Sequence, residues 1–231
     1  MKKFFLFAAA AIAAMTVNAE TLVFDADTAA HKTAGAWSDG YTWELETFDV
    51  TLVDTKAKMT VDANNAYFGT ADQHIKLQSR LKSGGKSAAS GENSIEIEVY
   101  EAGKLSIAVR TGSNSATDRT LVVTQSGTEL FNQVIQESDA VEVEGLDKDD
   151  PTKKTKIYPI ITCNVGVGTV VLTYPVGSMN FYAFAIGDIE IPEPQGIENA
   201  AATVKAVKTF ENGQLVIIKN GVKYNALGAQ L

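Results

Sequence analysis

The amino-acid sequence predicts an all-β protein, a jelly-roll β-sandwich with a small three-stranded β-meander at its C-terminal end. The first observation is alternation of apolar and polar residues with period two, clearest where Ile95, Ile97 and Val99 alternate with Glu96 and Glu98. The second is that Gly, Asn, Asp and Ser separate runs rich in β-branched and aromatic residues. The third is that no amphipathic helix stands out beyond the first nineteen residues. Many short antiparallel strands favour a sandwich or a jelly roll.

The sandwich is predicted to span residues 20–191. Residues 94–100 and 104–110 alternate in the same way on either side of Ala102-Gly103, which predicts that they pair as a hairpin. The other predicted strands, read from the same alternation and from flanking turn residues, are 22–24, 41–45, 48–53, 58–61, 74–81, 119–124, 129–135, 140–143, 155–161, 169–174, 180–186 and 188–191.

The first nineteen residues have the pattern of a secretory signal peptide. Met1-Lys2-Lys3 is basic, Phe4 to Ala14 is apolar, and Val17-Asn18-Ala19 predicts cleavage before Glu20. The apolar run is too short to span a bilayer, and no other stretch reaches eighteen apolar residues, so we expect no membrane span. We therefore expect an exported protein, extracellular or on the outer cell surface, with the periplasm as the alternative.

The net charge and the number of cysteines limit which partners and which covalent cross-links the chain can have. Removing the signal from the 231 residues takes Lys2 and Lys3 with it and leaves 18 basic and 28 acidic residues, a net charge of −10. Such a chain repels nucleic acid and anionic lipid at long range, so neither is expected as a partner. Cys163 is the sole cysteine, which excludes an intramolecular disulfide and predicts a buried small side chain.

The sequence after residue 191 differs from the sandwich. Pro192-Glu193-Pro194-Gln195-Gly196 begins a linker predicted to span 192–202, because two prolines cannot donate to a strand ladder. Residues 203–231 follow as the meander, with turns at Asn212-Gly213 and Asn220-Gly221.

Two parts of the chain resemble proteins of Bacteroidetes. Residues 212–228, with paired Asn-Gly turns and Tyr224-Asn225-Ala226-Leu227-Gly228, resemble the C-terminal sorting tail of type IX secretion, although the chain ends in Gln230-Leu231 rather than in basic residues. The resemblance implies the outer-membrane secretion machinery as a partner; the alternative is a degenerate tail that only packs on the sandwich.

The sandwich itself is similar to the β-sandwich modules that accompany pectate lyases. The matching pieces are Arg80 to Gly85, Gly103 to Ile107, Asp118 to Val123 and Met179 to Phe184. This resemblance implies a jelly-roll module with glycan affinity. It does not imply lyase activity, because the catalytic right-handed β-helix of those enzymes is absent.

The residues themselves offer little for catalysis. His31 and His74 lack the spacing of a zinc site, and no nucleophile elbow or Cys–His pair stands out. Glu96 and Glu98 are expected on the solvated face of a strand. We therefore expect a non-catalytic protein.

Glycan binding needs aromatic rings beside hydrogen-bonding and charged groups. Trp37 lies in a Gly/Ser/Asp-rich stretch, and Tyr41 follows it, although Tyr41 and Trp43 share a strand face and could equally be core. Arg80 and Lys82 precede a Gly-Gly loop that ends at Lys86, and arginine binds the carboxylates of acidic sugars in bidentate fashion. The predicted ligand-binding residues are Trp37, Tyr41, Arg80, Lys82, Asn114, Asp118 and Arg119.

For each of these residues the alternative is structural: Trp37 packs locally, Arg80 and Lys82 belong to a solvated basic loop, and Arg119 pairs with Asp118.

No cofactor or metal is expected; calcium at Asp147-Lys148-Asp149-Asp150 or Asp25-Ala26-Asp27 is the alternative. The sequence thus predicts an exported carbohydrate-binding protein for an acidic plant or host glycan. A structural or adhesive surface protein that meets protein partners is the other reading.

Overall fold

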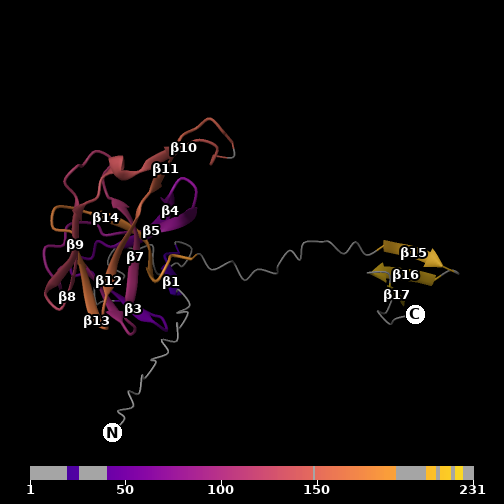
Figure 1. The fold of residues 1–231 in the computed structure, drawn as a ribbon, viewed down its shortest axis with the longest axis horizontal. Helices are drawn as coiled ribbons and strands as arrows, with labels where there is room; N and C mark the ends of the chain where they lie inside the picture. Colours follow the sequence, from indigo (N-terminus) through magenta and orange to yellow (C-terminus); the bar gives the residue numbers. More distant parts are fainter. Residues whose placement is uncertain are drawn as a thin grey trace, which may run out of the picture. The chain divides into compact units, whose positions relative to one another are not determined.

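The computed structural model describes residues 20–25, 41–147, 149–190, 207–211, 214–219 and 222–225. Two β-sheets face each other in the larger part of the chain (Figure 1), which confirms the predicted all-β sandwich. The curled sheet contains β1 (Glu20–Val23), β4 (Thr60–Gly69), β5 (His74–Lys82), β7 (Gly103–Thr111), β10 (Val141–Val143), β11 (Thr155–Tyr158), β12 (Ile160–Val165) and β14 (Met179–Ile186). The second sheet contains β2 (Tyr41–Glu44), β3 (Phe48–Val53), β6 (Ser94–Val99), β8 (Thr120–Gln125), β9 (Thr128–Val134) and β13 (Gly168–Thr173).

The main core lies between the two sheets. Strands of both sheets contribute alternate side chains to it, such as Ile95 and Ile97 from β6 and Ile107 from β7, all fully buried. β14 lies in the interior of the curled sheet, between β5 and β7, and all eight of its residues are buried because it is covered on both faces. The alternation that the sequence shows in β6 is therefore the mark of a strand with one buried face.

The second face of β14 is covered because its sheet curls. The strand order is β10-β11-β4-β5-β14-β7-β12, with β1 also paired to β14, and β11 and β12 stand far apart in that order. Only Pro159 separates these two strands in the sequence. Proline has no backbone N–H, so the ladder can break there, and the chain leaves β4 and pairs with β7 instead. Consecutive residues therefore pair with β4 at one side of the sheet and with β7 at the other. The single strand predicted over 155–161 is wrong in this respect, because it is broken at Pro159.

The curl encloses a second core on the face that points away from the second sheet. Its buried members come from five strands and the segment after β14: Ala66, Phe68, Leu77, Ala108, Tyr158, Tyr182, Ala183, Ala185 and Ile189. Small alanines of β7 and β14 leave room for the aromatic rings. The ring of Phe68 lies 4.9 Å from that of Tyr182 and 5.8 Å from that of Tyr158.

The predicted hairpin of residues 94–100 and 104–110 is wrong. β6 belongs to the second sheet, between β3 and β13, whereas β7 lies in the curled sheet between β14 and β12. Both strands bury an apolar face in the same core, and alternation identifies the buried face of a strand but not its neighbours. The strand predicted over 188–191 is also absent from 188–190, the part that the structure describes.

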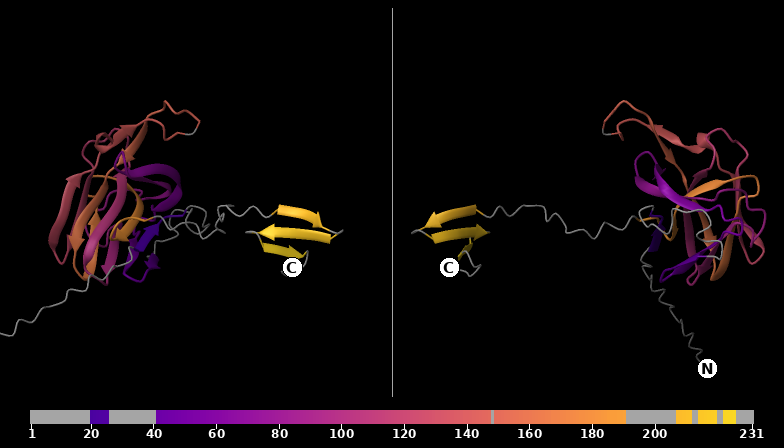
Figure 2. Two further views of the ribbon diagram at one scale, coloured as in Figure 1. Left: turned by 45° about the vertical axis from the view of Figure 1, so that its right-hand side comes forward. Right: turned by 180° about the vertical axis from the view of Figure 1, so that it is seen from behind.

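The C-terminal unit is an antiparallel three-stranded meander of β15 (Val207–Glu211), β16 (Gln214–Lys219) and β17 (Val222–Asn225). The chain divides into compact units between Ile191 and Pro192. The meander has the strand order that the two Asn-Gly dipeptides predict. Figure 2 shows the strands of each unit from two further sides, with the β10–β11 hairpin extending beyond the body of the sandwich.

Candidate functional site

Polar side chains gather on the outer face of the curled sheet, beside the second core. We call this set the polar cluster; it consists of Asp62 and Asn64 of β4, Arg80 and Lys82 of β5, Arg110 of β7, Tyr158 and Lys156 of β11, Tyr182 of β14, Asn114 and Glu137. The strand residues face outward because they alternate with core-facing neighbours: Arg80 and Lys82 flank the buried Leu81, and Arg110 follows the buried Val109.

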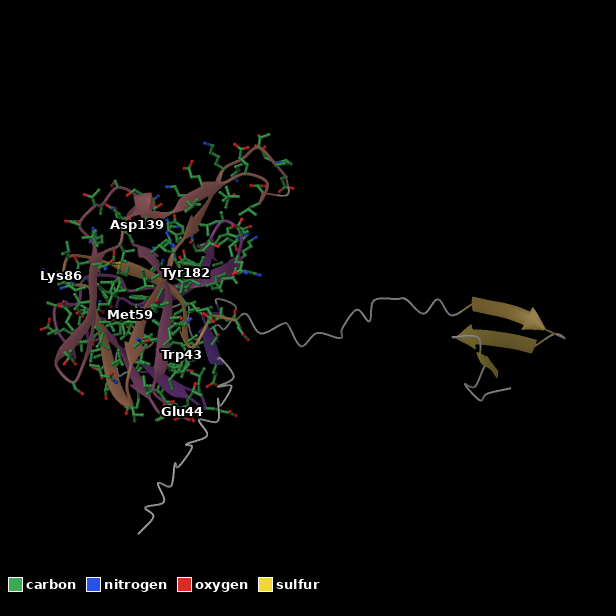
Figure 3. The ribbon with its side chains drawn as sticks, viewed as in Figure 1. Trp43, Glu44, Met59, Lys86, Asp139 and Tyr182 are labelled. Carbon is green, nitrogen blue, oxygen red and sulfur yellow. The ribbon has the colours of Figure 1, made fainter. Side chains whose placement is uncertain are left out.

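Two strand irregularities shape the cluster. The register of β4 against β5 shifts between Ala63 and Ala66, and that of β14 against β7 shifts between Phe181 and Ala183. Such bulges redirect side chains. Asn64 and Tyr182 lie inside the two bulges, and the Tyr182 hydroxyl donates a hydrogen bond of 2.5 Å to Oδ1 of Asn64. Tyr182 is fully buried, and in the view of Figure 3 it lies between Asp139 and Trp43.

The first ion pair of the cluster joins neighbouring strands. Nε and Nη2 of Arg80 donate to the two carboxylate oxygens of Asp62, at 2.8 and 3.3 Å, and Lys82 Nζ lies 2.9 Å from the same carboxylate. Burial alone would raise the pKa of Asp62, but the hydrogen bonds from Arg80 and Lys82 outweigh it and hold this pKa below its usual range. Lys82 keeps 41% of its side chain exposed and is the more exposed of the two cationic side chains that pair with Asp62.

A second network centres on Glu137 of the short 3-10 helix η2 (Glu137–Asp139). Its carboxylate accepts hydrogen bonds from Arg110 Nη2 at 2.9 Å, from the Tyr158 hydroxyl at 2.8 Å and from Lys156 Nζ at 3.2 Å. The guanidinium of Arg110 also donates to Asn114 Oδ1 at 3.1 Å and lies 4.8 Å from the centre of the Tyr158 ring. Its Nε is buried and has no hydrogen-bond partner among the described residues.

The Tyr182 hydroxyl connects the two networks. Burial raises the pKa of Tyr182, and the positive charges of Arg110 and Arg80 oppose that rise, so both guanidinium groups lie close enough to act on this phenol. Burial and the hydrogen bond to Glu137 likewise raise the pKa of Tyr158. The cluster thus contains four cationic side chains and two carboxylates around neutral phenols, a local excess of positive charge on an acidic chain.

Acidification is expected to weaken the Asp62 pair. Because the folded-state pKa of Asp62 lies below its unfolded value, the stability it contributes is present above that unfolded value and is lost as pH falls through the folded one. Urea unfolding between about pH 6 and pH 2 should show wild type losing its advantage over Asp62→Asn as pH falls below about 4. A constant difference over this range would contradict the assignment.

The structure brings together three of the predicted ligand-binding residues, Arg80, Lys82 and Asn114. Tyr41 lies elsewhere, on the edge strand β2 of the second sheet, with 40% of its surface exposed. Its ring meets Trp43 edge-on at 4.7 Å, and Trp43 packs partly buried against the main core. Trp37 lies outside the described residues.

Asp118 and Arg119 lie in the loop before β8, and Arg119 packs against another loop. The guanidinium of Arg119 occupies the space where a side chain at Gly177 would point, since a Cβ there would be 0.9 Å from its Nη1. Its Nε lies 4.0 Å from Oδ1 of Asp118, and its carbonyl accepts from the Ile135 amide at 2.7 Å. This geometry gives Arg119 a part in holding these loops together.

The Gly-Gly loop after Lys82 is held in place rather than free. Gly84 has φ +66°, and a Cβ there would lie 2.2 Å from the carbonyl oxygen of Lys58. The buried Ser83 accepts from the Met179 amide through its hydroxyl and from Asn93 Nδ2 through its carbonyl, and Tyr174 donates to the Asn93 carbonyl. Glycine is needed at this position for close backbone packing.

Two of the acidic residues considered for calcium, Asp147 and Asp150, already have partners. Asp147 accepts hydrogen bonds from the amides of Asp149 and Asp150 at 3.0 and 3.3 Å, and from Lys153 Nζ at 2.6 Å. The hydrogen bond from Lys153 is the main reason that the pKa of Asp147 is lowered. No three His, Cys, Asp or Glu side chains converge as metal ligands within the described part of the chain, and Asp27 lies outside it.

Comparison with known proteins adds no relative. No protein-family model matches the chain, and no characterised protein matches its sequence. Within the segments that the structure describes, no helix has the length and apolar character needed to cross a membrane.

Proposed function

We propose that this protein is an exported, non-catalytic carbohydrate-binding protein, and that the polar cluster binds an acidic glycan. The observation that carries the proposal is the grouping of Arg80 and Arg110 about the Tyr182 hydroxyl, with Lys82 on the Asp62 carboxylate that Arg80 also contacts, on the outer face of the curled sheet. These groups come from neighbouring strands, so the sheet fixes their spacing before any ligand arrives.

The chemistry of the cluster suits a uronic acid. Lys82 offers an ammonium on a partly exposed side chain, and Asn114 offers an amide on an exposed residue, so that a sugar carboxylate and ring hydroxyls both find donors. The carboxylates of Asp62 and Glu137 are each engaged by two cationic side chains. This engagement supports a binding role for the cluster over acid–base chemistry. Export and the secretion machinery as a partner of the meander rest on the signal-like start and the tail resemblance.

One observation favours the alternative, a structural or adhesive surface protein with protein partners. Arg80 and Arg110 are already paired, at 2.8 and 2.9 Å, and their side chains are only 21% and 15% exposed. Such internal pairing would also serve simply to stabilise the open side of the second core. The two proposed functions differ in one respect: only the glycan-binding function requires Lys82 to contact a ligand.

The test is binding of oligogalacturonate to the chain from Glu20 to Leu231, measured by calorimetry at low salt. Lys82→Ala removes one charge-assisted hydrogen bond to the ligand and leaves Arg80 paired with Asp62. We expect affinity to fall about tenfold or more. Added salt should weaken wild-type binding, because the contact is between charges.

The matched control is Lys153→Ala, which removes an exposed lysine that is also ion-paired, with Asp147. It should leave affinity unchanged, and neutral glucans should not compete. A well-folded sample that binds no acidic glycan, or an equal loss in both variants, would overturn the proposal and favour the adhesive role.

A further inference from the structure

A groove of about 410 Å³ opens on the outer side of the curled sheet, distinct from the polar cluster. We call it the His74 groove; its lining residues include Gln73 and His74, Ile75, Ile160, Thr162 and Asp188. On β7 it reaches Ser106, four residues from Arg110 of the cluster, which is roughly 13 Å along a strand. The two features therefore lie toward opposite ends of the same strands.

We propose that the His74 groove is a second binding site, which takes a neutral sugar ring. The apolar side chains of Ile75, Ile160 and Ile189 offer a surface for the C–H face of a pyranose. Polar groups stand around them: the Gln73 amide, the Thr162 hydroxyl and the Asp188 carboxylate are all on exposed residues. An apolar floor with a polar rim is the general form of a saccharide site. The proposal does not depend on the function proposed for the polar cluster.

His74 provides the second observation. Its Nδ1 is buried and has no hydrogen-bond partner among the described residues, while its ring packs edge-on against Tyr67 at 5.8 Å. A buried polar atom without a partner costs free energy, so such atoms commonly have a ligand or water as partner. His74 lines the groove, and a sugar hydroxyl can donate to or accept from an imidazole nitrogen, which makes it a fitting partner there.

Both walls of the groove are held in position. On one side, the β4–β5 turn is fixed by the Thr70 amide donating to the Gln73 carbonyl at 2.7 Å and by the Gln73 amide donating to Thr70 Oγ1 at 3.1 Å. On the other, the Gly187 amide donates to the Lys104 carbonyl at 2.7 Å, and Lys104 also pairs with Asp188. A ligand would thus meet a formed site without a large ordering cost.

The chain offers a clean reporter, because it contains only two histidines. In a His31→Gln background, the imidazole resonances of His74 can be followed by NMR while methyl glycosides of glucose, galactose, mannose and N-acetylglucosamine are added. We expect at least one neutral glycoside to shift these resonances in a saturable manner. Thr162→Val should weaken that ligand by about tenfold, since it removes a rim hydroxyl and keeps the shape.

Lys82→Ala is the control, and it should leave the His74 response unchanged, whether or not the polar cluster binds acidic glycans. His74→Ala, followed by calorimetry, should weaken the same ligand; where that variant fails to fold, Thr162→Val still decides. Absence of any saturable shift at His74 would overturn the second site. So would a response that Lys82→Ala abolishes, because the ligand would then be bound at the polar cluster.

Discussion

Replacing Phe68 by alanine is expected to lower the free energy of unfolding by about 3–5 kcal/mol. Phe68 is fully buried and packs between the rings of Tyr158 and Tyr182 in the second core. Its removal leaves a cavity where rigid strands on several sides prevent the surroundings from collapsing. Urea unfolding followed by circular dichroism measures the loss directly.

The control for this prediction is the neighbouring residue. Tyr67 points to the opposite face of β4, where it is half-buried beside Lys76, so Tyr67→Ala should cost about 1 kcal/mol or less. Equal losses from the two substitutions would show that the interior of the curl is not a packed core. The contact between the rings of Tyr158 and Phe68 would then contribute little to stability.

Replacing Glu137 by alanine is expected to cost about 3 kcal/mol of stability. The Glu137 side chain is only 12% exposed and accepts hydrogen bonds from Arg110, Lys156 and Tyr158. Arg110, itself 15% exposed, would keep its charge in a poorly solvated place without the carboxylate that balances it. The loss comes mainly from that uncompensated charge, so Glu137→Gln should recover part of it by keeping an acceptor.

Asp139 in the same 3-10 turn provides the comparison. Its carboxylate accepts from the Gln136 amide at 2.8 Å and caps the turn in an exposed position, so Asp139→Ala should cost about 1 kcal/mol. Chemical denaturation of the three variants at neutral pH separates the two roles. A loss in Glu137→Ala no larger than in Asp139→Ala would mean that Arg110 finds other compensation.

Part of the candidate site could be predicted from the sequence. Arg80 and Lys82 flank Leu81 in an alternating run, so their position on the face opposite the main core followed from the burial of the leucine. Arg110 sits in the same relation to Val109 and could have been found by the same argument. Glu137, Tyr158 and Tyr182 could not, because they join the cluster only through the curl of the sheet and the bulges in β4 and β14.

Local patterns in the sequence determined the all-β class, the position of most strands, the buried face of strands such as β6, and the order of the C-terminal meander. These properties depend on side-chain alternation and on turn residues, which act over a few neighbouring positions. Tertiary structure alone decided that β6 and β7 lie in different sheets and that Pro159 lets one run of chain serve two flanks of the curled sheet. It also decided that Gly84 is fixed by the backbone of Lys58. Strand partners and close approaches depend on contacts between residues far apart in the chain. Alternation along one strand does not predict these contacts.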